Sequence, residues 1–257
     1  MTPIARCVLA ALMVSVTSVA GAAQAAPATG PVTAPQPAAP QSAAPQPTVQ
    51  APLPPPRFVV VIDAAHGGDD LGGHLSDGTY EKAATLALSV RLKSLLGARG
   101  IQVIMTRDGD QSVTTDQRAA IANHANAQGC ISLHVAETGS GVHLFASNLP
   151  PVTATRFMPW KTAQSVYVTR SLALTGALNS ALQHGGATVT LARVPLPGID
   201  NMTCPAVAIE LAPERSADKK VTAEPDNPDY QARIAATLAT ALLEWRAEAG
   251  NPGGRQP

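Results

Sequence analysis

The stretch Phe58-Val-Val-Val-Ile-Asp-Ala-Ala-His-Gly-Gly68 decides the fold class of this chain of 257 residues. It begins with a continuous apolar, mostly β-branched run, which is typical of a strand that is buried on both faces of a sheet. The two glycines that follow the histidine allow the backbone to turn tightly there. The stretch therefore predicts a central strand that ends in a polar turn.

Further along, strand-like and helix-like segments alternate. Thr79 can cap a helix over residues 79–98, the capping box Thr114-Thr-Asp-Gln117 opens a second helix to about residue 127, and Asn227-Pro228 begins the last helix. Another helix is expected over residues 162–183, and the remaining strand-like runs are 101–106, 130–135, 142–146, 187–191 and 205–211. Strands separated by helices predict one α/β domain with a mostly parallel or mixed sheet flanked by helices. Ligands collect at the carboxyl ends of the strands in such sheets.

The N-terminal segment differs in composition from the rest. Residues 1–25 have the pattern of a signal peptide, with Arg6 before an apolar stretch and Ala23-Gln-Ala25 as a cleavage site; an uncleaved anchor is the alternative. Residues 26–56 form a Pro/Ala-rich linker without charge, which we expect to be extended and disordered. These features predict a secreted or periplasmic protein.

Charge and hydropathy exclude several classes of partner. The formal net charge is +0, so the chain has no excess of positive charge with which to bind nucleic acid or an anionic membrane surface. No part of the mature chain reaches the roughly 18 strongly apolar residues that a membrane span requires. Cys130 and Cys204 each begin an apolar run; an oxidising compartment permits a disulfide, but we expect buried thiols.

Four residues carry the predicted chemistry. Strand-like runs lead to His66, His134 and Glu210, and Glu81 begins the first helix. In a parallel sheet all four can meet at one edge. Two imidazoles and one carboxylate are a catalytic zinc set that leaves a position open to water. Zinc lowers the pKa of that water from about 15.7 to about 7, and a second carboxylate can then transfer its proton.

Simpler explanations exist for some of these residues. Glu81 is also favoured in the first turn of a helix by the helix dipole. Glu210 is harder to explain without function, because it interrupts an apolar run in which an unpaired carboxylate is costly. Asp63 is expected to accept a hydrogen bond near the site or to hold the loop. No matching context surrounds the other four histidines, which are His74, His124, His143 and His184. Of these, His124 and His184 are expected on solvated faces of helices.

Several motifs together resemble a known family. They are Val61-Ile-Asp-Ala-Ala-His-Gly-Gly68, Tyr80-Glu-Lys82, Ile101-Gln-Val-Ile-Met-Thr-Arg-Asp108, Arg118-Ala-Ala-Ile-Ala-Asn123, Ile131-Ser-Leu-His134 and Pro205-Ala-Val-Ala-Ile-Glu210. In this order they resemble the zinc-dependent N-acetylmuramoyl-L-alanine amidases of the cell-separation type. The resemblance implies that Zn²⁺ is bound by His66, Glu81 and His134 and that Glu210 is the catalytic carboxylate. The implied substrate is peptidoglycan, cut between N-acetylmuramic acid and L-alanine, with residues 57–249 as catalytic domain and 250–257 as disordered tail.

The sequence departs from the family pattern beside these residues. Ala64-Ala65 replaces the usual Pro-Gly, Ala136 replaces an Asn, and Leu211-Ala212 follows the catalytic glutamate. Two alternatives therefore stay open, a degenerate amidase that binds peptidoglycan without cutting it and another zinc peptidase such as a carboxypeptidase. A serine hydrolase is not expected, because the sequence has no Gly-x-Ser-x-Gly motif. A protein activator stays open as a further partner.

Overall fold

A mixed sheet of six strands forms the centre of the computed structural model, which describes residues 57–155, 157 and 159–249. The predicted signal peptide, linker and C-terminal tail lie outside these residues. The strand order is β2-β1-β3-β6-β4-β5. The strands are β1 Val59–Ala64, β2 Gln102–Met105, β3 Gly129–Val135, β4 Val142–Ser147, β5 Val189–Val194 and β6 Ala206–Leu211. All neighbours are parallel except β4 and β6, which confirms the expected α/β domain with a mixed sheet.

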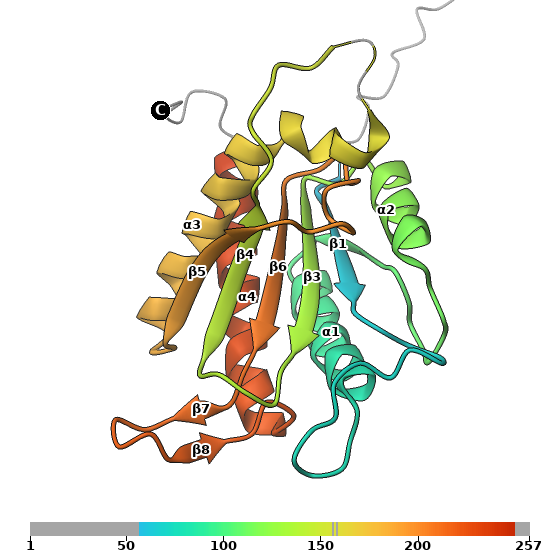
Figure 1. The fold of residues 1–257 in the computed structure, drawn as a ribbon. Coiled ribbons are helices and arrows are strands. Elements are labelled where there is room, and N and C mark those ends of the chain that lie inside the picture. The colour runs from blue at the N-terminus through green and yellow to red at the C-terminus, as the bar shows by residue number, and fades with distance from the viewer. Residues whose placement is uncertain (1–56, 156, 158, 250–257) are drawn as a thin grey trace, which may run out of the picture. The chain divides into compact units, whose positions relative to one another are not determined.

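Helices cover both faces of this sheet (Figure 1). One face packs against α1 Glu81–Gly97, α3 Val168–His184 and α4 Pro228–Ala249, which together enclose the larger apolar core. The other face packs against α2 Thr115–His124 and the loop before β6, in a smaller cluster of mainly small side chains. Small residues such as Ala206 and Ala208 leave room on this second face, and the candidate site residues of β3 and β6 lie on it.

Local signals predicted some helix ends correctly and others not. The Thr114 capping box is present, and Asn227 Oδ1 accepts hydrogen bonds from the Asp229 and Tyr230 amides at the start of α4. The cap at Thr79 is wrong, because Tyr80 occupies that position and Thr79 donates instead to the Asp77 carboxylate. Helix α2 ends at His124, earlier than expected.

The single helix expected over residues 162–183 is also wrong. The chain forms a 3-10 segment, η1 Trp160–Val166, and α3 begins only at Val168. The buried Gln164 amide donates to the carbonyls of Met202 and Cys204, 3.0 Å away in each case, and its oxygen accepts from Ser171. Turning this side chain into the interior satisfies loop carbonyls that a continuous helix would leave unpaired. A short hairpin, β7 Glu214–Arg215 with β8 Val221–Ala223, was not predicted either.

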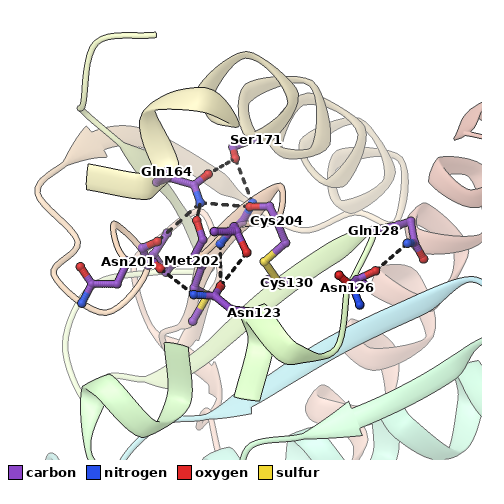
Figure 2. The surroundings of a disulfide bond; sticks show 12 residues. Asn123, Asn126, Gln128, Cys130, Gln164, Ser171, Asn201, Met202 and Cys204 are labelled. Carbon is purple, nitrogen blue, oxygen red and sulfur yellow. Dashed lines mark hydrogen bonds between the residues drawn. A yellow bond between two sulfur atoms is a disulfide. The ribbon is translucent and has the colours of Figure 1, made fainter. Parts of the chain in front are cut away.

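The two cysteines form a disulfide, which corrects the expectation of free thiols. Figure 2 shows the bond between Cys130, which lies in β3, and Cys204, which lies just before β6. Their Cα atoms are 6.2 Å apart. Because β3 and β6 are parallel neighbours, both cysteines lie at the same edge of the sheet. The bond ties the loop that precedes β6 to the sheet. No helix among the described residues has the length and apolarity to cross a membrane.

Breaking this disulfide is expected to lower the free energy of unfolding by about 2–4 kcal/mol, because the bond closes a loop and so lowers the conformational entropy of the unfolded chain. Urea unfolding of the oxidised protein, the reduced protein and the Cys130→Ala/Cys204→Ala variant measures the effect. An unchanged midpoint in both the reduced protein and the variant would contradict it.

Candidate active site

Three of the predicted ligand residues converge at the carboxyl ends of the strands. His66 lies two residues beyond β1, Glu81 is the first residue of α1, and His134 is the penultimate residue of β3. Each offers one ligand atom, and these atoms all lie within 4.8 Å of one another. Nε2 of His66 is 3.1 Å from Glu81 Oε2, and Nδ1 of His134 is 3.1 Å from Glu81 Oε1.

The turn after β1 gives His66 its position. His66 has φ 61, and the two glycines that follow also have positive φ. A side chain at Gly68 would collide with Ser112, and one at Gly72 would lie 2.7 Å from the His66 ring. Glycine at these positions lets the loop fold close to the ligand set.

Outer partners orient both imidazoles. Asp70 Oδ1 lies 2.8 Å from Nδ1 of His66, which leaves Nε2 directed at Glu81. Ser132 Oγ lies 3.5 Å from Nε2 of His134, which leaves Nδ1 directed at Glu81. A second ring nitrogen held in this way is typical of histidines that bind a metal.

Glu81 is buried and held as a carboxylate. The backbone amides of Gly73 and Val135 donate to its two oxygens. Burial raises the pKa of Glu81, but hydrogen bonds from His134, His66 and the Gly73 amide outweigh burial and hold the pKa well below its usual value. The pKa of His66 is raised, chiefly by its hydrogen bond with Glu81, although burial opposes this. Two partly exposed nitrogens and a buried, charged oxygen lie close together and fit the donor set that Zn²⁺ prefers.

Asp63 holds the framework beneath the ligands. Its buried carboxylate accepts from Thr106 and Ser132 and pairs with Arg118 at 2.7 Å. Arg118 also donates to the carbonyls of Ala64 and His66, so it fixes the turn that carries the first ligand. Asp63 thus binds Ser132, which lies beside His134, and pairs with Arg118, which holds the loop. This role of Asp63 was expected from the sequence, whereas the part played by Arg118 was not.

Glu210 lies on the strand next to His134. The two residues are register partners on β6 and β3, so their side chains lie on the same face of the sheet. On the other side, Glu210 is the register partner of His143 on β4, and Nδ1 of His143 is 2.8 Å from Glu210 Oε1. This contact of His143 was not expected from the sequence. The other histidines stay outside the ligand set, and His124 and His184 are exposed, as expected.

A cavity of about 320 Å³ opens beside the ligand residues. His66 and His134 line one side of it, and residues 196–199 of the loop before β6 line another. Asp63, Arg118 and Ser132 also contribute to its wall. The cavity therefore lies directly beside two of the three candidate ligand residues.

Comparison with known proteins agrees with this geometry. A family model described as N-acetylmuramoyl-L-alanine amidase matches residues 60–244. The germination-specific N-acetylmuramoyl-L-alanine amidase of Bacillus subtilis is 24% identical over 220 residues, covering 78% of this chain and 84% of that protein. The amidase AmiA of Escherichia coli is 37% identical over 78 residues, which cover 30% of this chain but only 27% of AmiA. Among solved structures, the amidase Ami1 of Mycobacterium smegmatis has a TM-score of 0.60 at 21% identity, covering 74% of this chain and 97% of that one.

An α/β domain with two histidines and a glutamate gathered at the sheet edge, and a second glutamate on the next strand, has the architecture of a metal-dependent hydrolase. With the family model matching most of the chain, the protein belongs to the N-acetylmuramoyl-L-alanine amidase family. It is a hydrolase of peptidoglycan, as the sequence motifs indicated.

Removal of the Asp70 carboxylate is expected to weaken zinc binding by about 10–100-fold, because the carboxylate fixes the ring and the protonated nitrogen of His66. Competition titration of Asp70→Ala with a zinc chelator measures this change. Asp69→Ala is the matched control, since this neighbouring exposed carboxylate has no contact with the His66 ring. Equal affinities for the two variants would refute the role of Asp70.

Zinc affinity of the metal-free chain is expected to fall at acid pH. The raised pKa of His66 means that its proton competes with the metal from above pH 6.5 downwards, whereas the lowered pKa keeps Glu81 charged throughout. Each pH unit below the raised pKa should cost at least about tenfold in affinity, because the proton on His66 must leave before the metal binds. Competition titrations between about pH 5.5 and about pH 8.5 test this expectation. An affinity that stays constant until well below the ordinary histidine pKa would contradict it.

Proposed function

We propose that this chain binds Zn²⁺ through His66, Glu81 and His134 and uses Glu210 as the acid–base residue of the hydrolysis. The bond cut is the amide between the lactyl group of N-acetylmuramic acid and L-alanine. The observation that carries the proposal is the gathering of three ligand atoms within 4.8 Å of one another, with Glu210 in register beside one of them. All four residues are retained despite the departures at Ala64, Ala65 and Ala136.

Different side chains of the protein have separate roles in the proposed hydrolysis. A bound zinc ion supplies Lewis acidity, which polarises the scissile carbonyl and makes water acidic enough to attack near neutral pH. Glu210 takes the proton from that water and returns it to the leaving amine of L-alanine. Asp70 and Ser132 keep the two imidazoles in the tautomers that present Nε2 of His66 and Nδ1 of His134. The cavity beside them receives the substrate strand that flanks the scissile bond.

Digestion of purified sacculi tests the proposed reaction. Mass spectrometry should detect free stem peptides that begin with L-alanine, together with glycan strands whose lactyl groups are free. Binding to sacculi without any release, by a fully zinc-loaded protein, would instead support a degenerate amidase. Release of only a terminal amino acid would support a carboxypeptidase.

The proposed place of action is the bacterial cell envelope. The relatives are cell-wall amidases, and residues 1–25 have an export pattern. Accumulation of the chain in the periplasm or medium, lost on deletion of residues 1–25, is the expected result of fractionation. A similar structure shows the CwlD amidase of Clostridioides difficile in complex with the GerS lipoprotein. We therefore also propose a protein activator, whose absence would leave hydrolysis by the purified chain slower than in envelope extract.

A further inference from the structure

We propose that His143 is a positioning residue that fixes one oxygen of Glu210, so that the other oxygen carries the proton during hydrolysis. The inference deepens the proposed function and rests on it. Neither the motifs of the sequence nor the predicted ligand set includes this histidine.

The first support is the contact itself. Nδ1 of His143 lies 2.8 Å from Glu210 Oε1. An ionised carboxylate can only accept hydrogen bonds, so Nδ1 donates to it whenever Glu210 is charged. Among the described residues, His143 is the one hydrogen-bond or ion-pair partner of the Glu210 side chain, and Oε2 takes no part in the contact. The carboxylate thus has one anchored oxygen and one that can exchange a proton.

The second support is the sheet. Glu210 pairs in register with His134 on one side and with His143 on the other. Register partners place their side chains on the same face, so the three residues form a row across β3, β6 and β4. Glu210 lies in the middle of this row, between a predicted zinc ligand and His143. A hydrogen bond from the far side therefore restrains the carboxylate without occupying the side that faces the ligand set.

The third support is the way in which the His143 ring is held. Phe145, on the same face of β4, makes an edge contact with the ring, with centroids 6.2 Å apart. Gly139 lies against the ring so closely that a Cβ there would be 2.7 Å from Cε1. Arg215 donates to the Gly139 carbonyl at 3.0 Å and secures that loop. The side chain of His143 is only 18% exposed, so its ring has little freedom to leave Glu210.

These contacts give His143 a defined part in the reaction. The proton leaves the attacking water, passes to Oε2 of Glu210 and then goes to the leaving amine nitrogen, while Oε1 stays bonded to His143. No atom of His143 is exchanged. Loss of the bond lets the carboxylate rotate, and misplacement of a reacting group by about 1 Å can cost about 100-fold in rate.

Two substitutions separate this role from simple packing. His143→Phe keeps a planar ring between Gly139 and Phe145 but has no donor, whereas His143→Asn loses the ring and keeps an N–H near the Nδ1 position. His184→Ala removes an exposed histidine at the end of α3 and serves as control. The assay measures kcat and KM for release of stem peptides from sacculi by the zinc-loaded full chain. Zinc content and melting temperature are measured for each variant.

We expect His143→Phe to lower kcat by about 10–100-fold with unchanged KM and zinc content, and His143→Asn to retain most of kcat. The opposite order, with Asn the slower variant, would show that the ring only packs and would overturn the inference. A kcat of His143→Phe equal to that of the wild type would overturn it as well. A wild-type chain that releases no stem peptides would refute the proposed function instead, so the two failures are distinguishable.

Discussion

Replacement of Glu210 by Gln lowers the kcat of stem-peptide release by about 10²–10⁴-fold and leaves the zinc content unchanged. The amide of Gln has nearly the shape of the carboxylate but cannot accept the proton of the attacking water at neutral pH. Since Glu210 lies on β6 and outside the His66, Glu81, His134 cluster, the proposed metal-binding residues are expected to keep their positions. Single-turnover digestion of sacculi with metal analysis of the same sample measures both quantities.

A matched control exists in the separate hairpin of β7 and β8. Glu214 is a half-exposed glutamate of β7 that pairs with Arg233 on the surface, so Glu214→Gln should retain near-normal turnover. Turnover by Glu210→Gln at the rate of Glu214→Gln would show that another group transfers the proton. Loss of zinc from Glu210→Gln would show instead that Glu210 helps to hold the metal.

Much of the fold follows from local sequence signals. Val59–Ala64 is completely buried as a strand, as its β-branched run predicted, and the capping box at Thr114 begins α2. The convergence of His66, Glu81 and His134 could be predicted because each residue stands at a strand end or at the first turn of a helix, where alternation of strands and helices brings residues to one edge. The geometry therefore follows from the topology, even though the three residues are far apart in the chain.

Contacts that depend on strand order could not be predicted in the same way. The sequence shows that Cys130 and Cys204 each lie near the start of a strand, but not that β3 and β6 are neighbours. The contact of His143 with Glu210 could not be predicted for the same reason, because it requires β4 to run antiparallel beside β6. In both cases the missing information was pairing across the sheet, which the pattern of a single strand does not contain.

Backbone hydrogen bonds hold two of the residues that depart from the family pattern, Ala65 and Ala136. Ala65 is buried and its amide donates to the Leu133 carbonyl, so the turn before His66 is held by backbone as well as by Arg118. The Ala136 amide donates to the Leu211 carbonyl and continues the pairing of β3 with β6 beyond His134. Neither alanine disturbs the ligand atoms, which supports an active enzyme over a degenerate one.

Substitution of either ligand histidine is expected to have the largest effect on metal binding. His66→Ala and His134→Ala each remove one of three ligand atoms, and the remaining pair leaves Glu81 buried beside a single imidazole. Because outer partners of such ligands alone change affinity by about 10–100-fold, loss of a ligand should weaken zinc binding by more than about 100-fold. Hydrolysis should fall to the background rate in both variants.

Metal analysis after dialysis, together with the sacculus assay, tests this expectation. His124→Ala is the matched control, because its ring is exposed on α2, away from the ligand set. Excess zinc should restore neither variant at concentrations that saturate the control. Full zinc occupancy in His66→Ala or His134→Ala would contradict the assigned ligand set, since no other described histidine, cysteine or acidic residue joins this cluster as a substitute.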